Sequence, residues 1–148
     1  MASPPITKPD TPDQMEAIIT RFYNDIWNVF DVSPADEIIA PDVTFRGTLA
    51  EGSTDREGFK RYVREIGAAF PDFYQRIDEM YTDGETCIAQ MYWTGTHTNV
   101  FRGVQPTGRK FAYPGVGIFK IHGGMIRECW VVGDTWEMWK VILDLERK

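Results

Sequence analysis

The chain has 148 residues, of which 43% are hydrophobic and 14% aromatic, and its formal net charge is −6. This length suits one domain with a substantial core. The acidic balance argues against nucleic-acid binding and against attachment to an anionic membrane surface, because both need a basic face. The first residues lack the apolar stretch of a secretion signal, and no apolar run is long enough to span a bilayer, so we expect a cytoplasmic protein.

The N-terminal part of the sequence predicts mainly helices. Residues 1–12 are rich in Pro, Ser, Thr and Asp, which favours a flexible arm ahead of a single domain over residues 13–148. Apolar residues at helical spacing predict a helix over 13–30 with Asp13 as its cap. The same signals predict a short helix over 35–39, a strand over 43–48, and a helix from Thr54 or Asp55 to about Phe70.

The remaining sequence predicts a β-meander and a closing helix. Strands over 73–81 and 86–96 flank an Asp-Gly turn, and a loop over 99–108 leads into a long hairpin with strands over 111–121 and 125–132. A helix over 136–145 ends the chain. The order ααβαββββα predicts an α+β fold in which a curved, mostly antiparallel sheet, wrapped by the N-terminal helices, encloses a cone-shaped cavity.

Two polar residues at strand ends, His97 and Asp134, are the candidate catalytic groups. Because side chains alternate along a strand, His97 shares a face with Trp93, and Asp134 shares a face with Trp130. If both faces turn inward, the imidazole and the carboxylate meet in one apolar pocket. Burial there would raise the pKa of Asp134, and the pair could move a proton on a carbon acid. A β-bulge in either strand would reverse this assignment of faces.

Further side chains are candidates for contact with a substrate, either because they share these strand faces or because they lie near the expected cavity. They are Tyr23, Trp27, Arg46, Met91, Trp93 and Trp130. Each candidate also has a plainer interpretation. The aromatic residues can be ordinary core, Arg46 a surface charge, His97 a structural residue, and Asp134 the N-cap of the final helix.

Neither a metal ion nor a cofactor is expected. Cys87 and Cys129 lie in separate apolar runs, and the sequence contains no CxxC motif or His/Cys cluster of the kind that binds zinc. Buried free thiols are the better interpretation, and they fit a reducing cytoplasm.

Several longer segments, in this order along the chain, resemble one known family, the SnoaL-like polyketide cyclases of the nuclear transport factor 2-like superfamily. They are FYNDIWN (22–28), APDVTFRG (40–47), REGFKRYVREIGAAFPDF (56–73), WTGTHTNVFRGVQPTGRKF (93–111) and GGMIRECWVVGDTWEMW (123–139). The resemblance implies a deep pocket, often a homodimer, and ring closure of a polyketide by intramolecular aldol chemistry without a cofactor. It also implies that Asp134 is the acid/base and that His97 assists. The chain departs from the family in its last helix, where Trp136 and Trp139 stand in place of a Leu-rich segment with a Gln-Leu pair.

The sequence therefore predicts a cofactor-independent cyclase or isomerase of secondary metabolism, acting as a homodimer on a small, apolar, carbonyl-containing substrate. Two alternatives stay open, because one fold serves many functions. The first is an epoxide hydrolase or ether-forming enzyme, for which Arg46, Tyr23 and Asn24 could help Asp134 to hold a water. The second is a non-catalytic small-molecule binding protein.

Overall fold

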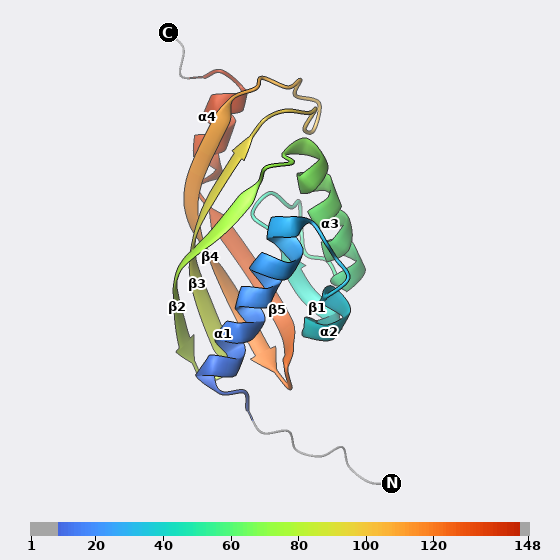
Figure 1. Ribbon diagram of the computed structural model, residues 1–148, viewed down its shortest axis with the longest axis vertical. Helices are drawn as coiled ribbons and strands as arrows, with labels where there is room; N and C mark the ends of the chain where they lie inside the picture. Colours follow the sequence, from blue (N-terminus) through green and yellow to red (C-terminus); the bar gives the residue numbers. More distant parts are fainter. Residues whose placement is uncertain (1–8, 146–148) are drawn as a thin grey trace.

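The computed structural model describes residues 9–145 and confirms the α+β class and the predicted order of the elements (Figure 1). One sheet has the strand order β1-β5-β4-β3-β2. All neighbouring strands are antiparallel except β1 and β5, which are parallel. Residues 1–8, most of the predicted arm, lie outside the described residues.

The strands are long, and tight turns join β2 to β3 and β4 to β5. Gly123 and Gly124 connect β4 to β5 with φ angles of 62° and 74°. This left-handed backbone at both positions is what a two-residue hairpin turn requires, so the Gly-Gly pair fixes the hairpin as predicted. The strands are β1 (Ile39–Arg46), β2 (Tyr74–Asp83), β3 (Thr86–Thr96), β4 (Lys110–His122) and β5 (Met125–Gly133).

The first helix begins earlier than predicted. Helix α1 (Pro12–Arg21) is capped by Thr11 and not by Asp13, because the Thr11 side chain and Gln14 bond each other's backbone N–H groups in a capping box. Just before it, the Asp10 carboxylate accepts hydrogen bonds at 3.1 and 3.2 Å from the backbone N–H of Gly124. The last residues of the predicted arm are therefore tied to the β4–β5 turn.

A widened helical turn follows α1 and aims aromatic side chains at the sheet. Residues Phe22–Ile26 form a π-helical turn and Trp27–Val29 a 3₁₀ turn. The π turn inserts an extra residue, and such insertions are frequent at functional sites. Here Tyr23 and Trp27 are both buried against the sheet.

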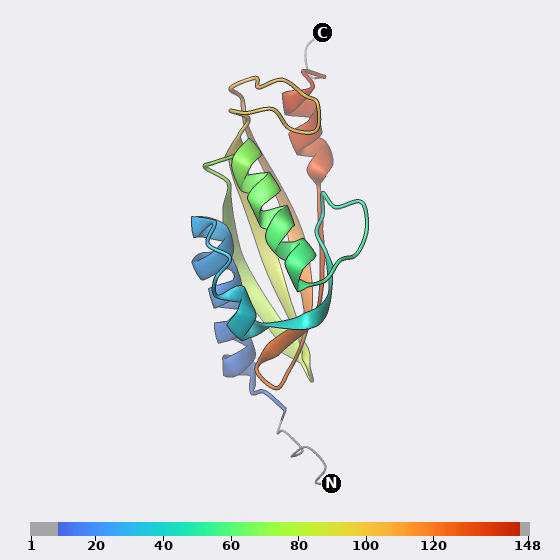
Figure 2. The same cartoon turned by 90° about the vertical axis from the view of Figure 1, so that its right-hand side faces the viewer.

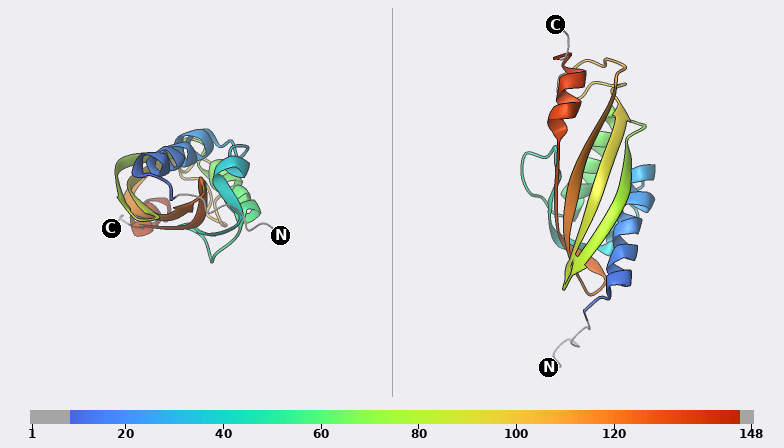
Figure 3. Two further views of the ribbon diagram at one scale, coloured as in Figure 1. Left: turned by 90° about the horizontal axis from the view of Figure 1, so that it is seen from below. Right: turned by 90° about the vertical axis from the view of Figure 1, so that its left-hand side faces the viewer.

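The helices gather on the concave face of the sheet. Figures 2 and 3 show α1 and α3 (Arg56–Ala69) lying across that face, with α2 (Ala35–Ile38) beside them. Helix α4 (Thr135–Ile142) packs beside β4 at one end of the sheet. Between the layers lies a core rich in aromatic rings, among them Phe22, Phe45, Phe59 and Phe119. None of the helices within residues 9–145 combines the length and apolar character needed to cross a bilayer.

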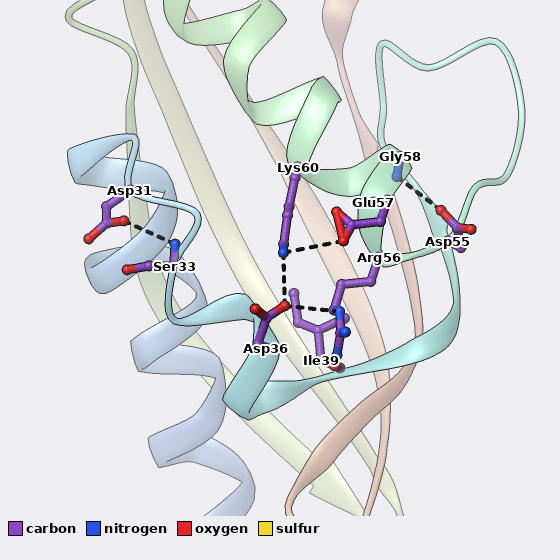
Figure 4. A network of polar contacts seen from close by, with 9 residues as sticks. All are labelled: Asp31, Ser33, Asp36, Ile39, Asp55, Arg56, Glu57, Gly58 and Lys60. Carbon is purple, nitrogen blue, oxygen red and sulfur yellow. Dashed lines mark hydrogen bonds and ion pairs between the residues drawn. The ribbon is translucent and has the colours of Figure 1, made fainter.

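A polar network holds α3 against α2 and β1 (Figure 4). The Asp36 carboxylate pairs with Lys60 Nζ at 2.8 Å and Arg56 Nε at 3.2 Å, and Arg56 also donates to the Ile39 carbonyl at 3.1 Å. The hydrogen bond from Lys60 lowers the pKa of Asp36. The sequence predicts that this helix starts at Thr54 or Asp55, and it is Asp55 that caps it, by accepting from Gly58 N–H at 2.9 Å. Together these contacts place the inner face of α3 over the sheet.

Candidate functional site

A narrow cavity lies between the concave face of the sheet and the helices. Its volume is about 20 Å³, which is room for about one water molecule. A larger ligand can enter only if part of the wall moves. The lining is predominantly aromatic and consists of Phe22, Tyr23, Trp27, Phe45, Gly47, Thr48, Leu49, Tyr62, Ile66, Phe73, Gln75, Trp93, Tyr113 and Val131.

Glycines on the inner face of the hairpin make room for the aromatic wall. Gly115 and Gly133 face each other across β4 and β5. A Cβ atom on Gly115 would lie 2.3 Å from Trp93 Cζ3, so the indole occupies space that any larger residue would fill. The Trp93 ring then packs on Tyr113, with ring centroids 5.3 Å apart.

Hydrogen bonds fix three polar groups in the cavity wall. Trp93 Nε1 donates to Gln75 Oε1 at 2.7 Å. Tyr62 Oη accepts from the Leu49 backbone N–H at 3.1 Å, and Thr48 Oγ1 accepts from Gly133 N–H at 2.9 Å. The last two bonds join the segment after β1 to α3 and to the end of β5, and so hold this side of the cavity wall together.

Two further phenol groups in the wall have no partner. The hydroxyl oxygens of Tyr23 and Tyr113 are buried, and neither forms a hydrogen bond within the described residues. Burial raises the pKa of both side chains well above the usual value for tyrosine, so both keep their protons at any physiological pH. Each hydroxyl can therefore donate to an acceptor in the cavity, whose lining includes neither a carboxylate nor an imidazole.

An open groove adjoins the cavity on the side of α3. It is lined by residues of the 50–54 segment, by Arg61 and Glu65 on α3, and by Arg102. Arg102 pairs with Glu65 at 3.2 Å. Phe45 and Tyr62 line both spaces, so these two rings lie between the narrow cavity and the groove.

The sequence matches one family model over most of its length. Residues 17–140 match the model of the SnoaL-like polyketide cyclases. The chain belongs to this family. Its curved, mostly antiparallel sheet with helices on the concave face is the nuclear transport factor 2-like fold that the sequence resemblance implied. No curated protein matches the sequence.

Solved structures of this family agree in fold. IdmH, a proposed polyketide cyclase from Streptomyces antibioticus, is 28% identical with a TM-score of 0.76, and the match covers 87% of this chain and 97% of IdmH. A proposed polyketide cyclase from Acidithiobacillus ferrooxidans is 26% identical with a TM-score of 0.77, covering 88% and 95%. A SnoaL-like protein from Jannaschia sp. CCS1, at 18% identity, shares the fold with a TM-score of 0.81 over 92% and 97%.

Three of the predicted substrate-contacting residues lie in the cavity wall of this SnoaL-like protein. They are Tyr23, Trp27 and Trp93. Met91 is buried on the same face of β3 but does not line the cavity. The alternation of side chains along β3 therefore places its inner face as expected.

The prediction that Asp134 shares this pocket with His97 is wrong. Lys120 pairs with Glu128 and Ile121 with Ile126, so Arg127 is an extra residue in β5. This β-bulge reverses which side chains point inward beyond it. Asp134 is consequently exposed.

Two other candidates also lie off the cavity. Trp130 is 45% exposed, and Arg46, its register partner on β1, is only half-buried. Neither residue lines the cavity.

His97 is buried at a different place, beside the C-terminal end of α3. Its Nδ1 lies 3.1 Å from Thr107 Oγ1 and accepts a hydrogen bond from the Thr107 backbone N–H at 3.3 Å. The ring packs against Phe70, at 5.9 Å between centroids, and Phe70 in turn contacts Phe73 in the cavity wall. His97 thus packs on the side of Phe70 away from the cavity, and its hydrogen bond with Thr107 fixes the loop that follows β3.

Four polar residues of the wall were missed by sequence reasoning. Tyr113 had a detectable signal, because it alternates with Gly115 and Gly117 on β4 and so belongs to the face with the smallest side chains. Tyr62, Gln75 and Thr48 carried no such signal, since their roles depend on how α3, β2 and the segment after β1 meet.

The structure gives no candidate metal site among the residues that it describes. Within residues 9–145, no three His, Cys, Asp or Glu side chains cluster as metal ligands would. Cys87 and Cys129 are free and buried, as the sequence predicts.

Proposed function

We propose that the protein is a cofactor-independent cyclase or isomerase that moves a proton on an apolar, carbonyl-containing metabolite of the polyketide type. The observation that carries the proposal is the aromatic cavity with unpaired phenol donors in a chain of the SnoaL-like family. Aromatic walls suit a flat apolar ligand, and fixed O–H donors suit a carbonyl oxygen that gains charge during the reaction.

Asp134 is the proposed acid/base, acting from the rim of the cavity. It follows Gly133, whose N–H donates to Thr48 in the cavity wall, and its own N–H donates to the Pro114 carbonyl at 2.9 Å. The Asp134 carboxylate is exposed and lies outside the cavity lining, so in this proposal both the end of β5 and the segment after β1, in which Thr48 lies, rearrange before it reaches a bound substrate. His97 has a positioning role in this proposal, because its ring lies behind Phe70.

The test is exchange of the α-protons of a simple ketone. The protein is incubated with 2-tetralone in D₂O, and loss of the α-proton signals is followed by ¹H NMR. We expect exchange above the buffer rate, and Asp134→Asn should lower it by about a hundredfold, as expected for loss of an acid/base. Asp144→Asn is the control, because it changes a carboxylate that pairs with Arg109 and does not line the cavity.

The alternative functions give different outcomes. A binding protein would bind 2-tetralone without accelerating exchange, and this result would refute the proposed catalysis. An epoxide hydrolase would instead incorporate ¹⁸O from labelled water into the diol formed from styrene oxide. The absence of a carboxylate from the cavity lining is the observation that keeps the binding function as the second candidate.

We further propose a cytoplasmic homodimer in which two copies meet through the outer face of the sheet. Two buried free thiols support a reducing compartment. Trp130 and Val132 are large, exposed side chains on that outer face, and a second copy of the chain would cover them. Sedimentation equilibrium should give twice the chain mass, and Trp130→Ser should shift the protein toward the monomer.

A further inference from the structure

The Tyr113 hydroxyl is one of the buried polar groups that have no hydrogen-bond partner within the described residues. The side chain is 1% exposed, it lines the cavity, and its oxygen has no partner within residues 9–145. A buried donor without an acceptor is costly, so native proteins rarely keep one without a reason. A ligand oxygen in the cavity would supply the acceptor.

The place of Tyr113 in the sheet puts it at the same end of the cavity as Asp134. Tyr113 precedes Pro114, whose carbonyl accepts the Asp134 N–H at 2.9 Å. The Tyr113 ring also packs over the end of β5, because a Cβ atom on Gly133 would lie 3.0 Å from ring atom Cε2. The phenol thus lies buried on the inner side of β4, whereas the Asp134 carboxylate follows the neighbouring strand and is exposed.

We infer that Tyr113 is a catalytic hydrogen-bond donor that holds the ketone oxygen of the substrate while it becomes an enolate. The inference rests on the proposed function and extends it by one residue. After the rearrangement that the proposed function requires, Asp134 takes the α-proton, and the electron pair of the broken C–H bond forms the C=C bond of the enolate. The oxygen takes the negative charge and accepts the Tyr113 hydrogen bond, while Tyr113 keeps its own proton. In a cyclisation, the enolate carbon then attacks a second carbonyl of the same molecule, and Asp134 returns the proton to the new alkoxide.

Two properties of the site suit this role. Burial raises the pKa of Tyr113, so the phenol stabilises charge by donating a hydrogen bond and does not lose its proton. The ring is also held rigidly by Trp93, whose indole is itself fixed by Gln75. A donor that is fixed before the reaction needs no reorganisation when the charge develops.

Tyr23 offers a matched control within the same cavity. Its hydroxyl is equally buried and unpaired, but it lies against Gly117 of β4. A Cβ atom on Gly117 would be 2.8 Å from this oxygen. Gly117 pairs with Val131, so this hydroxyl lies away from the Asp134 end of β5. Tyr23→Phe and Tyr113→Phe each remove one hydroxyl group, from different places in the cavity wall.

The experiment compares 2-tetralone with tetralin, which has the same ring system but lacks the carbonyl group. Binding is measured by calorimetry, and the infrared carbonyl band of bound ¹³C-labelled 2-tetralone reports the hydrogen bond directly. Tyr113→Phe should weaken 2-tetralone binding about two- to tenfold, the net value of one hydrogen bond, and leave tetralin within about twofold. The carbonyl band should move to higher frequency in Tyr113→Phe and move clearly less in Tyr23→Phe. In the exchange assay, Tyr113→Phe should lower kcat about a hundredfold, well beyond its effect on binding.

Several results would overturn the inference. These are an unchanged carbonyl band in Tyr113→Phe, an equal loss of tetralin binding, or wild-type protein that binds 2-tetralone no better than tetralin. Should Tyr113→Phe fold poorly, 3-fluorotyrosine at position 113 keeps the ring and strengthens the donor, and it should move the band to lower frequency. A band shift without any proton exchange would reject the proposed function, whereas exchange without a band shift would reject only the role of Tyr113.

Discussion

The Trp93 indole N–H donates to Gln75 Oε1 at 2.7 Å across β2 and β3, in the wall of the cavity. The two residues are only 2% and 4% exposed. Gln75 also joins this wall to the helical layer, since its backbone N–H and C=O bond the Asn28 side chain at 2.8 and 2.9 Å. One glutamine therefore orients the indole and connects β2 to the turn that carries Tyr23 and Trp27.

Gln75→Leu should lower the free energy of unfolding by about 1–3 kcal/mol, because it leaves the buried Trp93 N–H without an acceptor. Urea unfolding measures the change. In a Trp93→Phe background that N–H is already absent, so the same substitution should cost less. An identical loss in both backgrounds would show that the indole hydrogen bond contributes nothing.

Gly47 lies directly under the Tyr62 ring that separates the cavity from the groove. A Cβ atom on Gly47 would lie 2.5 Å from Tyr62 Cε2, whereas one on Gly52 would meet nothing within 4 Å. Gly47→Ala should therefore displace the ring and cost about 1–3 kcal/mol of unfolding free energy. Gly52→Ala, in the same segment, should stay within about 0.5 kcal/mol of the wild type. Equal thermal stability of the two variants would contradict the close packing described here.

Most of the fold could be predicted from the sequence, because its signals are local. The Gly-Gly turn, the start of α3 at Thr54 or Asp55 and the alternating apolar residues of β3 each depend on signals within a few positions. The pairing of Asp134 with His97 failed for a physical reason, namely the extra residue Arg127 in β5. That strand is apolar on both faces, so periodicity alone cannot reveal where the bulge reverses the pattern.

Removing an unpaired buried hydroxyl should stabilise the protein. Tyr113→Phe and Tyr23→Phe each abolish a desolvated O–H that has no partner in the described residues. We expect the free energy of unfolding to rise by about 1 kcal/mol or more for each. Chemical denaturation measures the gain, and Tyr81→Phe, at an exposed phenol, provides the comparison. A loss of stability in both cavity variants would mean that a bound water already satisfies the two hydroxyls.

Alkaline pH should destabilise the protein through its buried thiols. Burial raises the pKa of Cys87 from 9.0 to about 11, and it raises the pKa of Cys129 well above its usual value. Because the folded state holds these protons more tightly than the unfolded state, their contribution is complete below about pH 9 and is lost as the pH rises toward 11. Each thiol can change the unfolding free energy by about 1.4 kcal/mol per pH unit in that window.

Urea midpoints between pH 7 and 11 test the thiol contribution. Cys87→Ala removes one titrating group, so its stability should fall less steeply between pH 9 and 11 than that of the wild type. The wild-type thiols should also resist a thiol reagent at pH 8 until urea unfolds the chain, since both are buried. Parallel pH profiles for the wild type and Cys87→Ala would show that this thiol does not titrate with folding.

Two aspartates precede helices, and only one of them forms a cap. Asp55 accepts from Gly58 N–H at 2.9 Å at the start of α3, whereas the Asp134 side chain makes no capping hydrogen bond to α4. Asp55→Ala should therefore cost about 1 kcal/mol of unfolding free energy, and Asp134→Ala should stay within about 0.5 kcal/mol of the wild type. Thermal and urea unfolding of both variants give the comparison. If the two losses were equal, Asp134 would act as a helix cap in solution, and any lost activity in Asp134 variants could come from instability. Unequal losses would leave Asp134 free for the chemistry proposed at the cavity rim.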